Sequence, residues 1–246
     1  MTYRTGIGTS DADSITLMGR DLASELMGQV TLTQLTFLMI QGRMPSPEET
    51  RLFDAVLVSL ADHGLTPTVL AARLTYTGAP ESIQGAVAAG LLGAGSVFLG
   101  VVEDTARFLD EIGDDVEAGV TAALASGRRI PGLGHPVHKL QDPRTPRIYA
   151  IAEETGLIGS YLGRLSKVAE VHRKETGREL PINGAGVAGA ALADLGFPIP
   201  LLRGFALLAR TAGLLGHLAE EMQHPLGMPL YREVDERAKY DPPTGE

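Results

Sequence analysis

The sequence predicts an all-α protein, on two observations about where its apolar residues stand. Capping signals recur along the chain and are followed by apolar residues spaced three and four apart, which is typical of amphipathic helices. No convincing segment alternates apolar and polar residues between hairpin turns, as a strand would. The patterns predict helices near 14–28, 33–41, 47–62, 67–76, 82–94, 97–111, 115–126, 145–155, 160–175, 185–194 and 201–222.

The ends of several predicted helices carry specific signals. Ser46 can cap the helix that begins at Pro47, and Glu49 completes a capping box with it. In the same way, Thr66 and Pro67 are expected to begin the following helix. Four glycines are expected to end helices: Gly64, Gly78, Gly127 and Gly177.

Two segments have unusual compositions. Residues 85–100 are mostly Gly and Ala with Leu and Val, and such small side chains let helices approach closely inside a core or a subunit interface. We therefore expect this segment to be buried. Residues 225–246 contain four prolines and mixed charge, which predicts a tail that reaches a neighbouring subunit.

Composition bounds the class of protein and its partners. With 246 residues, 44% hydrophobic and 21% charged, the chain is expected to fold as one or two globular domains. Its net charge is −9, and no run of Lys and Arg is dense enough to follow a phosphate backbone, so nucleic acid is not an expected partner. An anionic ligand would have to be attracted by a local group of arginines.

Cysteine usage and targeting signals point to the same compartment. The chain has no cysteine, which excludes disulfides, thiolate metal sites and a cysteine nucleophile. Its first residues lack the basic and apolar stretches of a signal peptide, and the apolar run 85–95 is too short to span a bilayer. We expect a soluble cytoplasmic protein that does not bind a membrane.

The segment 129–144, RIPGLGHPVHKLQDPR, is expected to be a functional loop, because its prolines and glycines exclude a regular helix. Its spacing allows His135, the glycine backbone donors and Arg144 to converge on an anion. The alternatives remain open that His135 is merely exposed, or that it forms a metal site with His138, although two histidines alone make a weak ligand set. GLGH matches neither a Walker loop nor a dinucleotide-binding motif.

Two further residues invite a functional interpretation. His63 stands at the predicted end of the 47–62 helix, where a cation interacts favourably with the helix dipole, so capping explains it without a ligand. Arg210 lies on an apolar helix and must pair with an anion or extend its head to water.

Five segments, in order, carry a resemblance to a known family: GRDLASELMGQVTLTQLTFLMIQGRMPSPEE, LADHGLTPTVLAARL, PGLGHPVHKLQDPR, ARTAGLLGHLAEE and PLYR. The chain resembles the citrate synthase superfamily over nearly its whole length, in particular short citryl-CoA lyases and the lyase module of ATP-citrate lyase. The resemblance implies a large helical domain, placed at 1–104 and 201–246, and a smaller one at 105–200. It also implies that these close over acetyl-CoA and a di- or tricarboxylate.

The resemblance assigns roles to individual residues. It implies that His63 and His135 are catalytic, and that Arg144, Arg210 and Arg232 bind substrate carboxylates, a task that guanidinium forks perform bidentately. Arg232 would come from the neighbouring subunit of a homodimer or higher homo-oligomer. Four loop residues are implied to contact coenzyme A: Pro131, Gly132, Leu133 and Gly134.

Three positions depart from the pattern of the family. Ala185 stands where the family has its general-base aspartate, and the nearest downstream carboxylate, Asp194, is about two and a half helical turns away. Phe98 replaces the histidine of an HGG segment, as in the ATP-citrate lyase module. Pro136 replaces an arginine that follows the loop histidine in many lyases.

These departures narrow the function that the resemblance implies. Loss of a positioned acid or base costs about 10²–10⁴-fold in rate, which argues against synthase activity. The leading hypothesis is cleavage of citryl-CoA, or of a related 3-hydroxyacyl-CoA, to acetyl-CoA and a 2-oxoacid such as oxaloacetate. The alternatives are dehydration or hydrolysis of another CoA thioester, and a catalytically inactive binder of tricarboxylates or acyl-CoA. No metal and no tightly bound cofactor is implied, since coenzyme A is part of the substrate.

Overall fold

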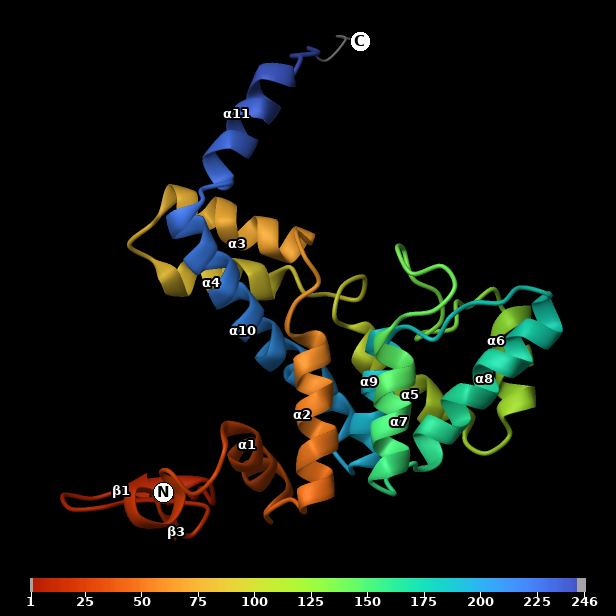
Figure 1. The fold of residues 1–246 in the computed structure, drawn as a ribbon, viewed down its shortest axis with the longest axis horizontal. Helices are drawn as coiled ribbons and strands as arrows, with labels where there is room; N and C mark the ends of the chain where they lie inside the picture. The colour runs from red at the N-terminus through yellow and green to blue at the C-terminus, as the bar shows by residue number, and fades with distance from the viewer. Residues whose placement is uncertain (1, 243–246) are drawn as a thin grey trace. The chain divides into compact units, whose positions relative to one another are not determined.

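The computed structural model describes residues 2–242 and has an all-α fold with one small sheet, so the predicted fold class is confirmed. The helices are α1 Leu32–Gln41, α2 Pro47–Ala61, α3 Pro67–Gly78, α4 Ile83–Leu92, α5 Val101–Ile112, α6 Val116–Ala125, α7 Arg144–Glu154, α8 Ser160–Thr176, α9 Gly184–Asp194, α10 Leu202–Gln223 and α11 Gly227–Arg237 (Figure 1). A 3₁₀ turn, η2 (Ile199–Leu201), leads into α10.

The predicted helix ends are largely confirmed. The amide of Glu49 donates to Ser46 Oγ at 3.1 Å, and the Ser46 amide donates to Glu49 Oε2 at 2.8 Å, which completes the capping box of α2. Gly177 ends α8 with a left-handed φ of 68°, and Gly127 follows α6 with a φ of 74°. Thr66 precedes α3 without a side-chain capping bond.

The helix predicted at 14–28 is wrong, because this segment belongs to a small antiparallel sheet. Its strands are β1 (Gly8–Ser10), β2 (Ile15–Leu17) and β3 (Arg20–Asp21), followed by the short π-helical turn η1 (Leu22–Leu26). Met18 and Gly19 both have positive φ, the conformation of a two-residue hairpin turn that matches the twist of its strands. Strands of two or three residues are too short to show an alternating pattern.

Contacts between Cα atoms divide the chain into two compact units. Unit 1 comprises Met1–Val56 and Val102–Leu202, and unit 2 comprises Leu57–Val101 and Arg203–Glu246. The predicted division is different, because it groups the N-terminal residues with 201–246 rather than with the residues that follow α4. Its two domains are 105–200, and 1–104 with 201–246. That division, which concerns closure over a substrate, stays a prediction.

Unit 1 is built around α9, whose residues are buried except Ala185 and Asp194. Its small side chains allow close packing: a Cβ at Gly189 would overlap the carbonyl oxygen of Val102 at the start of α5. A second part of the core is a group of three aromatic rings, in which Phe197 lies 5.2 Å from Phe37 and 4.9 Å from Phe53 between ring centroids.

Unit 2 has a smaller core where α10 packs on α3 and α4. Its fully buried residues are Val69, Ala72, Ala86, Leu214 and Leu218. A Cβ at Gly90 would lie 2.7 Å from Leu214 Cδ1, so this glycine permits the close contact of α4 with α10. The predicted burial of 85–100 is therefore correct for only part of the segment, because the Leu92 and Val97 side chains are 86% and 78% exposed.

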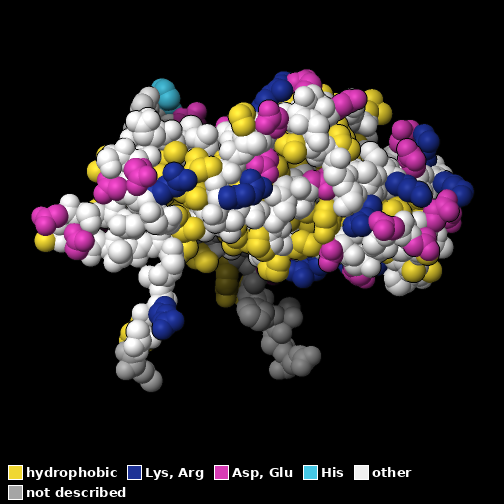
Figure 2. Space-filling model, turned by 90° about the horizontal axis from the view of Figure 1, so that it is seen from below, with side chains coloured by type: hydrophobic (Ala, Val, Ile, Leu, Met, Phe, Trp, Pro, Cys, Tyr) yellow, Lys and Arg dark blue, Asp and Glu magenta, His cyan; other side chains and the backbone are white. Residues whose placement is uncertain are grey.

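Residues 199–223, which include α10, are the one helical stretch among the described residues that is long and apolar enough to cross a membrane by length and composition. A core helix of a globular protein passes the same test. Leu214 and Leu218 of α10 are buried against α3 and α4. On the face shown in Figure 2, basic and acidic side chains are interspersed.

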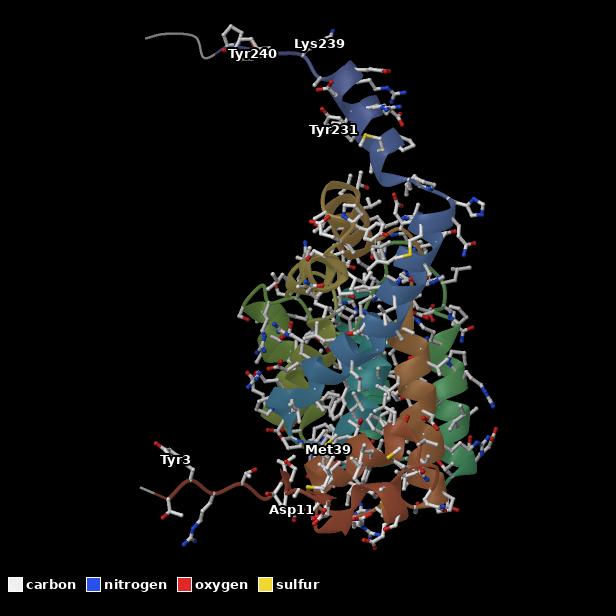
Figure 3. The ribbon with its side chains drawn as sticks, turned by 90° about the vertical axis from the view of Figure 1, so that its left-hand side faces the viewer. Tyr3, Asp11, Met39, Tyr231, Lys239 and Tyr240 are labelled. Carbon is white, nitrogen blue, oxygen red and sulfur yellow. The ribbon has the colours of Figure 1, made fainter. Side chains whose placement is uncertain are left out.

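The predicted tail at 225–246 is wrong in its first half, because Gly227–Arg237 form α11. The amides of Leu226 and Gly227, which begin this helix, donate to the carboxylate of Glu221 at 2.7–3.0 Å. Pro229 lies in the first helical turn, where its missing N–H costs little. Within unit 2, α11 extends beyond α3 and α10, and Tyr231 lies on it (Figures 1 and 3). Residues 243–246 lie outside the described residues.

Candidate functional site

The predicted site residues fall into two sets, each described by itself. Unit 1 carries the loop 129–144 and Ala185, whereas unit 2 carries His63, Phe98, Arg210 and Arg232.

Arg144 is the first residue of α7, and a neighbouring carboxylate holds its guanidinium. Nε donates to Asp142 Oδ1 at 2.9 Å and Nη2 donates to Asp142 Oδ2 at 2.7 Å, a bidentate arrangement. Asp142 is fully buried and also accepts from the Gly184 amide at 2.7 Å. Burial raises the pKa of Asp142, but the bonds from Arg144 and Gly184 outweigh it and hold this pKa well below its ordinary value. The ion pair is therefore formed at neutral pH.

The Arg144 side chain keeps 22% of its surface exposed, so the pair is accessible to a ligand. Its guanidinium lies directly over Gly184, where a Cβ would overlap the guanidinium carbon. Asn183 caps α9 by accepting from the Gly186 amide at 2.8 Å, and its Nδ2 donates to the Gly134 carbonyl at 2.9 Å. One side chain thus ties the loop to the start of α9.

The loop segment 132–134 is held against residues 181–183. The Gly134 amide donates to the Pro181 carbonyl at 2.7 Å, and the Asn183 amide donates to the Gly132 carbonyl at 2.9 Å. The Gly134 amide thus already has a carbonyl partner, and the role of the glycine amides as anion donors stays a prediction. Gly132, with φ 85°, lies against Gly186, where its own Cβ would also clash with Thr105. Contact of 131–134 with coenzyme A stays a prediction.

His135 is fixed in one tautomer by its own loop. Its Nδ1 accepts from the amides of His138 at 2.9 Å and Val137 at 3.1 Å. A nitrogen that accepts carries no proton, so the neutral ring holds its proton on Nε2. Nε2 can therefore donate to a substrate oxygen, and His135 is poorly suited to act as a base through that atom. The His138 ring packs beside it, with centroids 4.5 Å apart.

Ala185 lies in the first turn of α9, beside the Gly184 contact with Arg144, and is partly exposed. The only acidic residue of α9, Asp194, lies at its far end and serves another purpose. Its carboxylate accepts from the amides of Gly159, Tyr161 and Leu162 at the start of α8 at 2.9–3.2 Å. Asp194 therefore caps α8 and does not replace the missing carboxylate.

His63 lies in the turn after α2, and its neighbour Asp62 links this turn to α10. Asp62 Oδ2 accepts from the Gly64 amide at 2.9 Å, whereas Oδ1 lies 2.8 Å from His217 Nε2 and 3.9 Å from Arg210 Nη1. Burial raises the pKa of Asp62, but bonds from Gly64 and His217 outweigh it and leave this pKa below its ordinary value. Within unit 2, Arg210 therefore lies near the turn that carries His63.

The other predicted positions have fewer described contacts. Phe98 lies in the turn that precedes α5 and is 38% exposed, and Pro136 is exposed in the loop. Arg232 is exposed on α11. Their predicted roles stay predictions.

Sequence reasoning missed four side chains that organise these sites: Asp62, Asp142, Asn183 and His217. Asp142 and Asn183 could have been found, since one stands two residues before Arg144 and the other is a cap residue before a helix of small residues. His217 is two helical turns beyond Arg210, which places it on the same face of α10. Its pairing with Asp62 has no local signal.

Comparison with known proteins agrees with this arrangement. The family described as "Citrate synthase, C-terminal domain" matches residues 18–233. A citrate synthase of Deinococcus radiodurans is 32% identical over 194 residues, 75% of this chain and 51% of that protein. The chain spans about half the length of the curated relatives that it matches.

Two solved structures resemble this chain over nearly all of its residues. Citryl-CoA lyase from Hydrogenobacter thermophilus is 31% identical with a TM-score of 0.91, covering 100% of this chain and 97% of that one. ATP citrate lyase from Methanothrix soehngenii, in complex with citrate and coenzyme A, shares the fold at 23% identity and a TM-score of 0.81, covering 99% of this chain and 42% of that one. The chain belongs to the citrate synthase family and is similar along its whole length to a citryl-CoA lyase.

Proposed function

We propose that this chain is a carbon–carbon lyase that cleaves citryl-CoA, or a closely related 3-hydroxyacyl-CoA, to acetyl-CoA and a 2-oxoacid such as oxaloacetate. The observation that carries the proposal is the start of α9. There an arginine is held ready for a carboxylate, while Ala185 supplies no general base. The full-length likeness to a citryl-CoA lyase supports the same reaction.

Substrate binding is assigned to the arginines. Asp142 binds Arg144 through Nε and Nη2, and we place a substrate carboxylate against the part of this side chain that stays exposed, 22% of its surface. Arg210 is only 5% exposed, and its Nη1 lies 3.9 Å from Asp62 Oδ1. Citryl-CoA carries two free carboxylates, and one guanidinium for each compensates their charge within a protein of net charge −9.

The two histidines have different roles in this reaction. Cleavage begins when the tertiary hydroxyl of the substrate loses its proton, and the C–O⁻ becomes C=O as the adjacent C–C bond breaks. His135 Nε2 can donate to this oxygen and stabilise the developing negative charge, because its Nδ1 is occupied by two amides. We assign the removal of the hydroxyl proton to His63, since the tautomer of His135 does not suit that task.

The electron pair of the broken bond passes to the acetyl-CoA enolate, which must gain a proton at carbon. Ala185 cannot supply it, and Asp194 is engaged with the start of α8. Water therefore protonates the enolate in this proposal. In the reverse direction, Ala185 likewise provides no carboxylate to take the α-proton of acetyl-CoA. Citrate synthesis is therefore expected to be slow.

Three parallel assays test the proposal. Purified full chain is incubated with citryl-CoA, with citrate alone, and with acetyl-CoA plus oxaloacetate, and acetyl-CoA, oxaloacetate and free CoA are quantified. The proposal expects acetyl-CoA and oxaloacetate in equal amounts from citryl-CoA only. Free CoA with citrate, in place of acetyl-CoA, would identify a hydrolase.

Substitution of the assigned groups gives a second test. Arg144→Gln is expected to lower kcat/KM for citryl-CoA by about 100-fold, because a charge-assisted bidentate contact is lost. Arg147→Gln, a change at a mostly exposed arginine one turn further along α7, is the matched control and should retain activity. Unchanged binding and turnover in Arg144→Gln would refute this anion site.

A further inference from the structure

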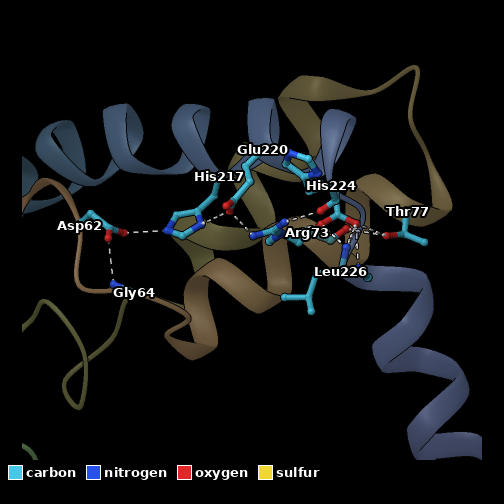
Figure 4. A network of polar contacts seen from close by, with 10 residues as sticks. Asp62, Gly64, Arg73, Thr77, His217, Glu220, His224 and Leu226 are labelled. Carbon is cyan, nitrogen blue, oxygen red and sulfur yellow. Dashed lines mark hydrogen bonds and ion pairs between the residues drawn. The ribbon is translucent and has the colours of Figure 1, made fainter.

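The turn that carries His63 is held from α10 by a second histidine, His217. Asp62 lies between them: one carboxylate oxygen accepts from the Gly64 amide within the turn, and the other lies 2.8 Å from His217 Nε2 (Figure 4). A carboxylate of lowered pKa only accepts hydrogen bonds, so His217 Nε2 carries the proton of this contact. The conformation of the turn around His63 therefore depends on a donor from α10.

His217 stands between two carboxylates, and its surroundings leave it little freedom. Its side chain is 14% exposed, and its buried Nδ1 lies 3.8 Å from Glu220 Oε2. Glu220 Oε2 in turn accepts from Arg73 Nη1 at 2.7 Å. The imidazole is thus held in a row of polar side chains that runs from Asp62 through Glu220 to Arg73.

The far end of this row is anchored at the start of α11. Arg73 Nε donates to Glu221 Oε2 at 2.5 Å, and Glu221 accepts from the amides of Leu226 and Gly227 (Figure 4). Arg73 and Glu221 are each 3% exposed. The network therefore couples the turn of His63 to rigid, buried groups of α3 and α10.

The backbone of α10 packs closely against the end of α2, just before this turn. A Cβ at Gly213 would overlap the carbonyl oxygen of Ala61, the last residue of α2, so α10 touches the main chain just before Asp62. Arg210 and His217 flank this contact, two helical turns apart on one face of α10. Both approach the same oxygen, Asp62 Oδ1, at 3.9 and 2.8 Å.

We infer that His217 is a positioning residue for His63: by donating to Asp62, it fixes the turn that presents the His63 imidazole to substrate. His217 itself does not touch the substrate in this assignment. The inference deepens the proposed function and rests on it for the role of His63, whereas the contact between His217 and the turn can be tested without any substrate.

The substrate-free test follows the amide of Gly64 and the ring of His63 by NMR in the full-length protein. Three variants are compared: His217→Leu removes the donor, His217→Gln keeps an N–H donor near Nε2, and His224→Leu makes the same change at an exposed histidine just past α10. His217→Leu should speed hydrogen exchange of the Gly64 amide about 10-fold, the effect of losing one supporting hydrogen bond. His217→Gln and His224→Leu should leave exchange and the His63 ring signals near wild type.

The kinetic test separates positioning from general stability. His217→Leu should lower kcat for citryl-CoA by up to about 100-fold with a smaller change in KM, because a displaced base affects the chemical step most. His217→Gln should restore most of the rate. In a His63→Gln background, His217→Leu should cost less than about 3-fold more, since the two side chains then act on one step.

Each result has a definite consequence. The inference would be overturned if the losses in kcat from His63→Gln and His217→Leu multiplied in the double variant. It would also be overturned if the Gly64 amide of His217→Leu exchanged at the wild-type rate. If the wild-type chain does not cleave citryl-CoA but Gly64 and His63 respond as expected, the proposed function fails while the contact is supported. Turnover of citryl-CoA that is insensitive to His217→Leu would uphold the function and refute the positioning role.

Discussion

Two arginine–carboxylate pairs, one in each unit, are built alike and differ in what surrounds them. In unit 1, Asp142 binds Arg144 and accepts the Gly184 amide at the start of α9. In unit 2, Glu221 binds Arg73 and accepts the Gly227 amide at the start of α11. Each carboxylate therefore neutralises an arginine and fixes the beginning of a helix.

The surroundings distinguish the proposed binding site at Arg144 from the structural pair at Arg73. Arg73 donates from all three of its nitrogens, to Glu221, Glu220 and the His224 carbonyl, and its side chain is 4% exposed. Arg144 donates to Asp142 through Nε and Nη2, and its side chain is 22% exposed. The difference teaches that an arginine paired with a carboxylate remains a candidate ligand-binding group when part of its side chain stays exposed to solvent.

The largest effect is expected at the fully buried pair. Glu221→Gln leaves the Arg73 charge buried beside a neutral amide and weakens the start of α11, which should lower the free energy of unfolding by about 3–5 kcal/mol. Denaturant titration followed by circular dichroism measures this change. Glu220→Gln is the matched control, since its side chain is 55% exposed and should cost less than about 1 kcal/mol. Equal losses in both variants would contradict the distinction.

Asp142→Asn is expected to cost about 2–3 kcal/mol, less than Glu221→Gln because Arg144 reaches water. The pKa of Asp142 is lowered on folding, so its contribution is fully present above the ordinary value of 3.8 and is lost as the pH falls below it. The difference in unfolding free energy between wild type and variant should thus be constant from pH 7 to 5 and shrink in stronger acid. A difference that grows on acidification would show the sign to be wrong.

Gly184→Ala addresses access to the Arg144 guanidinium. The new Cβ would overlap the guanidinium carbon, so the side chain must shift while the pair with Asp142 adjusts. A displacement of about 1 Å should lower kcat/KM for citryl-CoA by about 100-fold, with little change in thermal stability. Steady-state assays and thermal melts measure both quantities.

Gly163→Ala on α8 provides the comparison for this substitution. No atom lies within 4 Å of a Cβ there, and the residue is helical, so alanine should stabilise the chain by about 0.5–1 kcal/mol without altering activity. If Gly184→Ala retained full activity, as Gly163→Ala should, then catalysis would not depend on the present position of the Arg144 guanidinium.

The two pairs also show what sequence can predict. The capping box at Ser46, most helices and the loop at 129–144 follow from local patterns, because their partners lie within a few residues. Asp142 and Arg144 are two residues apart and share this property. The helix α11 was missed because its capping carboxylate lies before Pro225, outside the pattern that normally marks a helix start.

Non-local contacts explain the remaining failures. Asp62 and His217 are separated by 155 positions, and Arg73 and Glu221 by 148, so no spacing rule connects them. The tautomer of His135 was equally hidden, since it depends on two amides of a loop whose conformation the sequence leaves open. Family resemblance named His63, His135 and Arg144, but only the structure shows which atoms of these side chains are already engaged.

The smallest effect on stability is expected from Ala185→Asp, which sharpens the comparison at the accessible site. The new carboxylate would lie in the first turn of α9, where the helix dipole favours it, so unfolding should change by less than about 0.5 kcal/mol. In D₂O with oxaloacetate, the variant should exchange methyl protons of acetyl-CoA up to about 10-fold faster than wild type, a modest gain because no other group has been arranged to position this base.

Mass spectrometry of acetyl-CoA measures the exchange, and Ala185→Asn controls for size. Equal exchange in the Asp and Asn variants would place the reacting carbon away from α9, and the argument from Ala185 against synthase activity would then fail.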